Sequence, residues 1–88
     1  MRLDKFLKVS RLIKRRSVAN EICSSGRVAL NGRPAKPGAE VKPGDILEIT
    51  FGQGRSRIQI REVRETVRKE QAQELYVILD SGQPGELN

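Results

Sequence analysis

The spacing of the apolar residues changes at Gly26, and this change constrains the possible folds more than any other feature of the chain. Before Gly26, apolar residues recur three and four positions apart, as they do along one face of an α-helix. After Gly26, they alternate with polar residues, as they do in a half-buried β-strand. The pattern predicts an α+β fold in which two short N-terminal helices pack on a small, mostly antiparallel sheet, with a short C-terminal helix.

The N-terminal part is predicted to form two helices, one over residues 2–9 and one from Ser17 to Gly26. The apolar face of the first helix consists of Leu3, Phe6 and Leu7. Asp4 lies in its first turn, where a carboxylate interacts favourably with the helix dipole. Ser17 is the predicted N-cap of the second helix, because a serine hydroxyl can accept a hydrogen bond from a first-turn amide. Gly26 is expected to end this helix, since glycine tolerates the left-handed backbone found there.

The C-terminal part is predicted to form strands at residues 28–30, 46–51, 57–61 and 76–79. Asn31-Gly32 follows the first of these and is typical of a tight hairpin turn. In residues 46–51, and again in residues 57–61, apolar side chains alternate with polar ones, so one face of the sheet is expected to be buried.

The remaining segments complete the predicted organisation. Residues 52–54 are expected to form a loop, and residues 68–75 favour a short helix by propensity. We expect one domain over residues 1–80, with a core motif over about residues 1–51, and a flexible tail over residues 81–88.

Composition argues against several classes of protein. The chain has 88 residues, enough for one domain, and no apolar run approaches the roughly 20 residues of a membrane span. Its start lacks the apolar core of a secretory signal, so we expect a cytoplasmic protein. Cys23 is the only cysteine, which argues against an internal disulfide and a thiolate zinc site and leaves its own role open. Histidine, the usual general base, is absent. We expect no catalytic residue, no metal and no cofactor.

Charge is distributed unevenly along the chain. Residues 1–36 contain ten lysines or arginines and two acids, for a net charge of +8. Residues 37–88 contain seven basic and nine acidic residues, for a net charge of −2. A basic half joined to a slightly acidic half indicates one face that binds a polyanion.

The most informative stretch is the run of cations directly before the second predicted helix. Lys14, Arg15 and Arg16 oppose the helix dipole there and repel one another, which disfavours the fold. The arrangement becomes favourable if an external anion binds, because helix amides and neighbouring cations together form a phosphate site. A solvated basic loop is the alternative, and the regional excess of positive charge favours the phosphate site.

Aromatic residues are nearly absent, and this sets the expected mode of binding. Proteins that hold single-stranded RNA usually stack bases on exposed aromatic side chains. Phe6 and Phe51 lie on apolar faces of their predicted elements and are expected in the core. Contacts should therefore be with phosphates and ribose of folded RNA.

Several segments, in unbroken order, resemble the RNA-binding domain named after small-subunit ribosomal protein four, whose core is called the alpha-L motif. The matching segments are Arg2-Leu3-Asp4-Lys5-Phe6-Leu7, Ser10-Arg11, Arg16-Ser17-Val18-Ala19, Gly26-Arg27-Val28-Ala29-Leu30-Asn31-Gly32, Lys36-Pro37 and Val41-Lys42-Pro43-Gly44-Asp45-Ile46. They cover about half of the chain. The resemblance implies two helices on a short sheet and binding to RNA.

The resemblance also implies which residues form the RNA surface. Carried over position by position, they are Arg2, Asp4, Lys5, Arg11, Lys14, Arg15, Arg16, Ser17, Asn20, Arg27, Asn31, Arg33 and Lys36. Asp4 either orients a neighbouring arginine for phosphate contact or serves only the helix dipole. Asn31, followed by Gly32, is explained more simply by turn chemistry than by direct contact.

Free-standing copies of this domain that open with Met-Arg-Leu-Asp-Lys are similar to the RqcP group of ribosome quality-control factors and to the fifteen-kilodalton bacterial heat-shock proteins. This likeness implies binding to rRNA and tRNA on large ribosomal subunits that carry obstructed peptidyl-tRNA. It also implies support for alanine tailing of the stalled chain alongside a template-free tailing factor. The heat-shock relatives usually carry a longer basic C-terminal extension, so the RqcP group is favoured.

Other functions stay open at this stage. A constitutive ribosomal or ribosome-assembly RNA-binding protein is the main alternative. An enzyme is disfavoured, because the activities fused to this domain in other proteins reside in additional domains, and no phosphate-cradling loop or nucleophile elbow is found. Binding to a membrane surface is disfavoured because both predicted helices are short.

Overall fold

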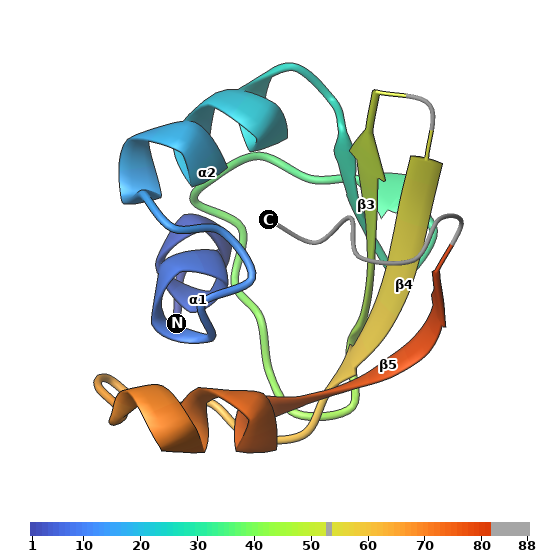
Figure 1. The fold of residues 1–88 in the computed structure, drawn as a ribbon. Helices are drawn as coiled ribbons and strands as arrows, with labels where there is room; N and C mark the ends of the chain where they lie inside the picture. The colour runs from blue at the N-terminus through green and yellow to red at the C-terminus, as the bar shows by residue number, and fades with distance from the viewer. Residues whose placement is uncertain (53, 82–88) are drawn as a thin grey trace.

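The computed structural model describes residues 1–52 and 54–81, and it has the predicted α+β architecture. Three short helices cover one face of a five-stranded sheet: α1 (Leu3–Val9), α2 (Arg16–Ser24) and the 3₁₀-helix η1 (Lys69–Leu75). In Figure 1, α1 lies between α2 on one side and η1 on the other. None of the helices in the described ranges is long and apolar enough to cross a membrane.

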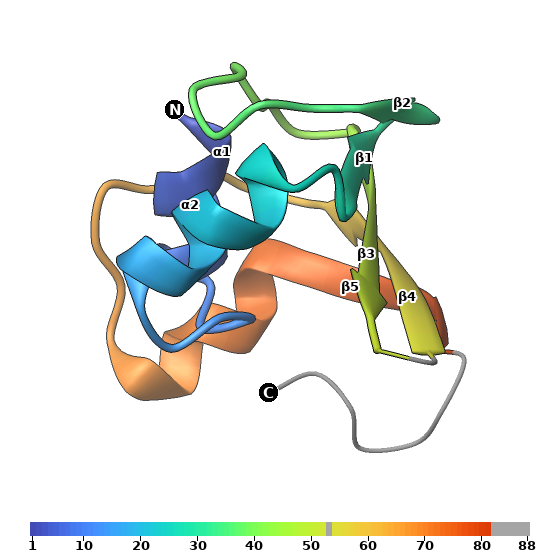
Figure 2. The same ribbon diagram turned by 90° about the horizontal axis from the view of Figure 1, so that it is seen from above.

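The sheet is antiparallel throughout, with the strand order β2-β1-β3-β4-β5. The strands are β1 (Val28–Leu30), β2 (Arg33–Pro34), β3 (Ile46–Phe51), β4 (Gly54–Ile60) and β5 (Tyr76–Ser81). Figure 2 shows the β1–β2 hairpin at one edge of the sheet, away from α1, and β5 at the other edge. The register places Leu30, Leu47 and Ile58 opposite one another on three neighbouring strands.

The core lies between the helices and the inner face of the sheet. Its fully buried side chains include Leu3, Phe6 and Leu7 from α1 and Leu47, Ile49, Ile58 and Ile60 from the sheet. The period-of-two pattern explains this, because alternate residues of a strand point to the same face. The prediction that Phe6 is a core residue is confirmed, while the side chain of Phe51 lies outside the described part.

Both α-helices end at a residue with left-handed backbone. At the end of α2, Gly26 has φ = +82°, its N–H donates to the carbonyl of Cys23, and the N–H of Arg27 donates to that of Ile22. These two bonds satisfy carbonyls of the last turn, as in a Schellman motif. The predicted role of Gly26 is confirmed.

The start of α2 differs from the prediction. Arg15, not Ser17, is the N-cap: its backbone is extended (φ −122°, ψ 135°), and its carbonyl accepts from the N–H of Ala19 at 3.0 Å. Ser17 lies in the first turn. Arginine has a good helix propensity, so the helix starts earlier than the serine suggests.

Other boundaries also shift. β4 starts at Gly54, three residues before the predicted strand, because it pairs with all of β3 from Ile46–Gln59 to Phe51–Gly54. Ser81 belongs to β5 instead of the tail. Residues 82–88, which include most of the predicted flexible tail, lie outside the described ranges, as does Gln53 in the predicted loop.

Asn31 and Gly32 form the predicted hairpin turn, with φ of +52° and +87°. The Asn31 side chain also holds the hairpin against the turn before β3. Its Nδ2 donates to Oδ1 of Asp45 at 3.1 Å, and its Oδ1 accepts from the N–H of Ile46 at 2.9 Å.

Candidate nucleic-acid interface

The carboxylate of Asp4 is the centre of a polar cluster that joins α1 to α2. Arg2 donates to both oxygens, from Nε to Oδ1 at 3.1 Å and from Nη2 to Oδ2 at 3.2 Å. From α2, Nη2 of Arg16 donates to Oδ1 and Nδ2 of Asn20 donates to Oδ2, both at 3.4 Å. We call these four residues the Asp4 cluster.

Local structure explains why these four side chains meet. Asp4 lies in the first turn of α1, and Arg16 and Asn20 are four residues apart, on one face of α2. Arg2 is the N-cap of α1, so its side chain can turn back over that helix. The segment after β2 braces the same end, since the Asp4 N–H donates to the carbonyl of Pro37 at 3.1 Å.

The Asp4 cluster combines a buried anion with exposed cations. The side chain of Asp4 is 3% exposed, whereas those of Arg2 and Arg16 are 54% and 48% exposed. Burial raises the pKa of Asp4, but the hydrogen bonds from Arg2 and Asn20 and the charge of Arg16 outweigh it and hold this pKa below its ordinary value. The same pairing raises the pKa of Arg2. Because each guanidinium carries five N–H donors, both arginines keep donors for an external anion.

A second group of cations surrounds the start of α2. Lys14 and Arg15 are exposed, and within the described ranges neither forms an ion pair. The first turn of α2 holds no acidic residue, and its N-cap makes no side-chain hydrogen bond to described residues. Ser17 is exposed in this turn. The arrangement agrees with the expected grouping of cations at a helix start.

Two predicted residues lie on the other side of α1. Lys5 pairs with the carboxylate of Glu65 in the segment between β4 and η1. Arg11 is exposed in the connection from α1 to α2 and has a left-handed backbone, with φ = +62°. Neither belongs to the Asp4 cluster.

The remaining predicted residues are spread from the end of α2 to the sheet edge. Arg27 follows α2, Arg33 lies on β2, and Lys36 lies in the segment that braces α1; all three are exposed. Asn31 is exposed as well, but both polar groups of its side chain bond within the fold. This agrees with the simpler interpretation of Asn31 as a turn residue.

Lys8 is a cation outside the predicted RNA surface. It is exposed, lies three residues after Lys5 on α1, and lines a hollow together with Arg11. Residues three apart are neighbours on a helix, so this spacing was the available signal.

In the part of the chain that the structure describes, Cys23 is poorly reactive and no metal site is formed. Burial, together with the negative charge of Asp4, raises the pKa of the Cys23 thiol to about 11, so the thiolate form is scarce at neutral pH. Within residues 1–52 and 54–81, no three His, Cys, Asp or Glu residues are grouped to hold a metal ion.

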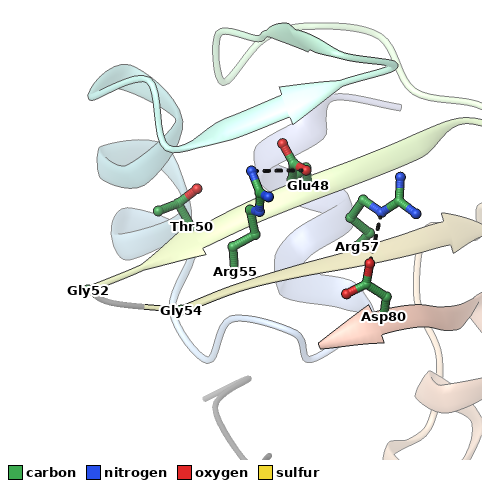
Figure 3. Close-up of a pocket in the computed structure, with 7 residues that line it drawn as sticks. All are labelled: Glu48, Thr50, Gly52, Gly54, Arg55, Arg57 and Asp80. Atoms are coloured by element: carbon green, nitrogen blue, oxygen red, sulfur yellow. Dashed lines mark ion pairs between the residues drawn. The ribbon is translucent and has the colours of Figure 1, made fainter. Parts of the chain in front are cut away.

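A larger hollow of about 590 Å³ lies on the outer face of the sheet (Figure 3). Its charged residues form two ion pairs, Arg55–Glu48 at 3.7 Å and Arg57–Asp80 at 3.3 Å. Two cations therefore face two acids. This balanced surface attracts a polyanion far less than the Asp4 cluster and the start of α2.

Comparisons with known proteins show the family to which this chain belongs. The sequence model of the S4 domain matches residues 1–47. A protein of Bacillus subtilis named RQC P-site tRNA stabilizing factor is 51% identical over 86 residues, which cover 98% of this chain and 100% of that protein. A protein of the same name from Halalkalibacterium halodurans is 59% identical over 78 residues, or 89% of each chain. Among solved structures, the trimeric structure of Vibrio cholerae Heat Shock Protein 15 matches with a TM-score of 0.82 and 34% identity, covering 89% of this chain and 80% of that one.

Proposed function

Because this chain belongs to the S4 domain family, we propose that it is a non-catalytic RNA-binding factor of the large ribosomal subunit. Its ligands there are rRNA and the peptidyl-tRNA that remains when a nascent chain is obstructed. By holding this tRNA, the protein supports ribosome-associated quality control, in which a template-free tailing factor adds alanine to the stalled chain in the cytoplasm. The relatives named RQC P-site tRNA stabilizing factors, at 51–59% identity, support the assignment.

The observation that carries this proposal is the Asp4 cluster. A long side chain loses up to about 2 kcal/mol of rotamer entropy when it is ordered. Arg2 and Arg16 are already oriented by Asp4 in the free protein. Part of this rotamer entropy is therefore lost on folding and is not lost again when RNA binds. Their half-exposed guanidiniums then offer charge-assisted hydrogen bonds to phosphate, which are among the stronger polar contacts.

The surface fits phosphate contacts better than base stacking. Phe6 is fully buried, and Tyr76, the first residue of β5, is half-buried against the core. The N-terminal helices therefore present cations without an aromatic platform in the described part. This supports binding to the backbone of folded RNA, with about four to seven ionic contacts and a strong dependence on salt.

A domain this small reaches useful affinity through two linked contacts. Part of the basic surface meets rRNA and another part meets tRNA, and each contact alone is weak. When both RNAs are held on one subunit, the second contact forms at a raised effective concentration. The protein should therefore accumulate on subunits that retain peptidyl-tRNA.

Arg16→Ala tests the site, with Arg68→Ala as the charge-matched control. Arg16 lies in the Asp4 cluster, whereas Arg68 precedes η1 in the neutral-to-acidic half. Binding to large subunits that carry peptidyl-tRNA should weaken by about 1–3 kcal/mol for Arg16→Ala and much less for Arg68→Ala. Circular dichroism should match the wild type for both, and alanine tailing in a reconstituted system should be lost with Arg16→Ala. Equal losses of binding would mean that net charge governs it.

Removal of peptidyl-tRNA tests the assignment to quality control. Isolated subunits should release most of the protein when the tRNA is removed and bind it again when the tRNA is restored. Equal binding to empty and loaded subunits would instead favour a constitutive ribosomal or assembly protein, and RNA binding itself would still stand.

A further inference from the structure

The edge of α1 that faces away from α2 forms a second basic surface. A hollow of about 210 Å³ lies between the end of α1 and the segment that connects β4 to η1. It is lined by Lys8, Val9, Arg11, Glu65, Thr66 and Val67. Lys5 joins this surface through its ion pair with Glu65. We call the hollow together with Lys5 the α1 groove.

The α1 groove is distinct from the Asp4 cluster. Asp4 reaches α2 through Arg16 and Asn20, whereas Lys5 reaches Glu65 in the segment before η1. Successive residues of a helix point about 100° apart, so Asp4 and Lys5 face different neighbours. Figure 1 shows α2 and η1 on opposite sides of α1. One short helix therefore presents cations in two directions.

The charges in the α1 groove are not balanced. Lys5, Lys8 and Arg11 supply three positive charges, and Glu65 supplies one negative charge, for a net of +2. Within the described part of the chain, neither Lys8 nor Arg11 forms an ion pair. A hollow that concentrates charge of one sign attracts the opposite charge.

The backbone of Arg11 adds an independent observation. Arg11 has φ = +62° at the position after the C-cap of α1, where glycine is the common residue because a side chain is strained there. Gly26 occupies the corresponding position after α2. An arginine kept in a strained conformation beside two other cations indicates a role for its charge.

We propose that the α1 groove is a second binding surface for the phosphodiester backbone of RNA, in which Glu65 occupies Lys5 until a phosphate displaces it. The inference rests on the proposed function and deepens it, because it assigns the second of the two RNA contacts to named residues. The Asp4 cluster and the α1 groove then hold RNA on both sides of α1. Glu65 can release Lys5 readily, because its side chain is 76% exposed and water can solvate its carboxylate in place of Lys5.

The charge-matched pair Lys8→Gln and Lys69→Gln tests the α1 groove. Both lysines are exposed, and Lys69 lies on η1. On large subunits that carry peptidyl-tRNA, Lys8→Gln should weaken binding about tenfold and reduce the salt slope by about one contact, whereas Lys69→Gln should have little effect. Repeating the measurement after tRNA removal identifies the RNA: a loss that persists belongs to rRNA, and a loss that disappears belongs to tRNA.

Removal of the negative charge of Glu65 should have the opposite effect on binding. Glu65→Gln should tighten binding about two- to fivefold, since an exposed ion pair no longer has to open. Glu70→Gln, which removes the same charge from η1, should change binding less. Equal gains for the two variants would overturn the role of Glu65.

Arg16→Ala separates this inference from the proposed function. If Lys8→Gln and Lys69→Gln bind alike while Arg16→Ala still loses affinity, the α1 groove is refuted and the proposed function stands. If Arg16→Ala loses no affinity either, the proposed function fails first. If the two surfaces are independent, the double variant Lys8→Gln/Arg16→Ala should show the product of the two fold-losses.

Discussion

At the scale of single residues, one buried carboxylate orients two arginines of the N-terminal basic surface. Asp4 bonds to Arg2 through both of its oxygens and to Arg16 through one. From the sequence, two roles of Asp4 were possible: interaction with the helix dipole and orientation of an arginine. Its contacts agree with orientation, because a carboxylate that served only the helix dipole would not need partners on a second helix.

Asp4→Asn should weaken RNA binding even though it raises the net charge by one. The amide keeps one acceptor oxygen but loses the attraction that holds two guanidiniums together, so the free energy of unfolding should fall by about 1–3 kcal/mol. Chemical denaturation and titration with large subunits measure the two effects. Asp80→Asn raises the charge equally but breaks an exposed pair with Arg57, so it should leave stability nearly unchanged. Tighter binding by both variants would contradict the orienting role.

Stability should depend on pH through the same carboxylate. The pKa of Asp4 is lower in the folded protein than its ordinary value of about 3.9. Its contribution is therefore complete above that ordinary value and is lost as the pH falls through the lower pKa of the folded state. Urea unfolding from pH 7 down to pH 2 should show the gap between wild type and Asp4→Asn closing below about pH 4. A gap that stays constant would rule out this titration.

At the scale of elements, the residue that follows the C-cap is an arginine in α1 (Arg11) and a glycine in α2 (Gly26). The N–H of Arg11 donates to the carbonyl of Lys8, as that of Gly26 donates to the carbonyl of Cys23. Both residues are left-handed, at φ of +62° and +82°. Glycine adopts this backbone freely, and arginine does so at a cost of about 1–2 kcal/mol.

Arg11→Gly and Gly26→Ala should therefore change stability in opposite directions. Arg11→Gly should raise the free energy of unfolding by up to about 1 kcal/mol and weaken RNA binding, because strain is relieved while a cation is lost. Gly26→Ala should lower stability by about 1 kcal/mol; its new methyl meets no atom within 4 Å, so the cost is backbone strain. Urea titration measures the stability of both variants, and titration with large subunits measures RNA binding. Destabilisation by Arg11→Gly would show that its side chain supports the fold.

At the scale of the whole molecule, the core extends beyond the part that matches the S4 domain. The match ends at residue 47, inside β3. Ile58 and Ile60 of β4 and Leu75 of η1 are among the fully buried side chains that complete the core under α1. The basic surface therefore depends on a C-terminal half whose own net charge is negative.

A fragment of residues 1–52 should consequently fail to unfold cooperatively. It lacks β4, the neighbour of β3, and it exposes apolar side chains that β4 and η1 cover. Circular dichroism during thermal unfolding tests this against the full chain. Ile58→Ala is a milder test, because it truncates a single core side chain. It should lower the free energy of unfolding by about 2–5 kcal/mol. A cooperative transition of the fragment at the temperature of the full chain would show that the N-terminal half is self-sufficient.

Local patterns alone were enough to predict most elements. Leu3, Phe6 and Leu7 indicated α1, the alternation over residues 46–51 indicated β3, and Asn31-Gly32 indicated the first hairpin. These features depend on residues within one or two turns of each other, so the chain specifies them without distant partners. The start of α2 was misplaced because a serine near a helix start resembles a cap whether or not the true N-cap lies two residues earlier.

The sequence by itself therefore determined the α+β class, the family resemblance and the concentration of cations before residue 37. Only the tertiary structure decided which cations lie close together. Asp4 meets Arg16 and Asn20 across 12 and 16 residues, and Lys5 meets Glu65 across 60 residues. Such pairs form because packing of helices on the sheet brings distant side chains together, and no local propensity encodes that contact. For the same reason, the helical spacing of Lys5 and Lys8 does not predict the hollow that Lys8 forms with the segment before η1.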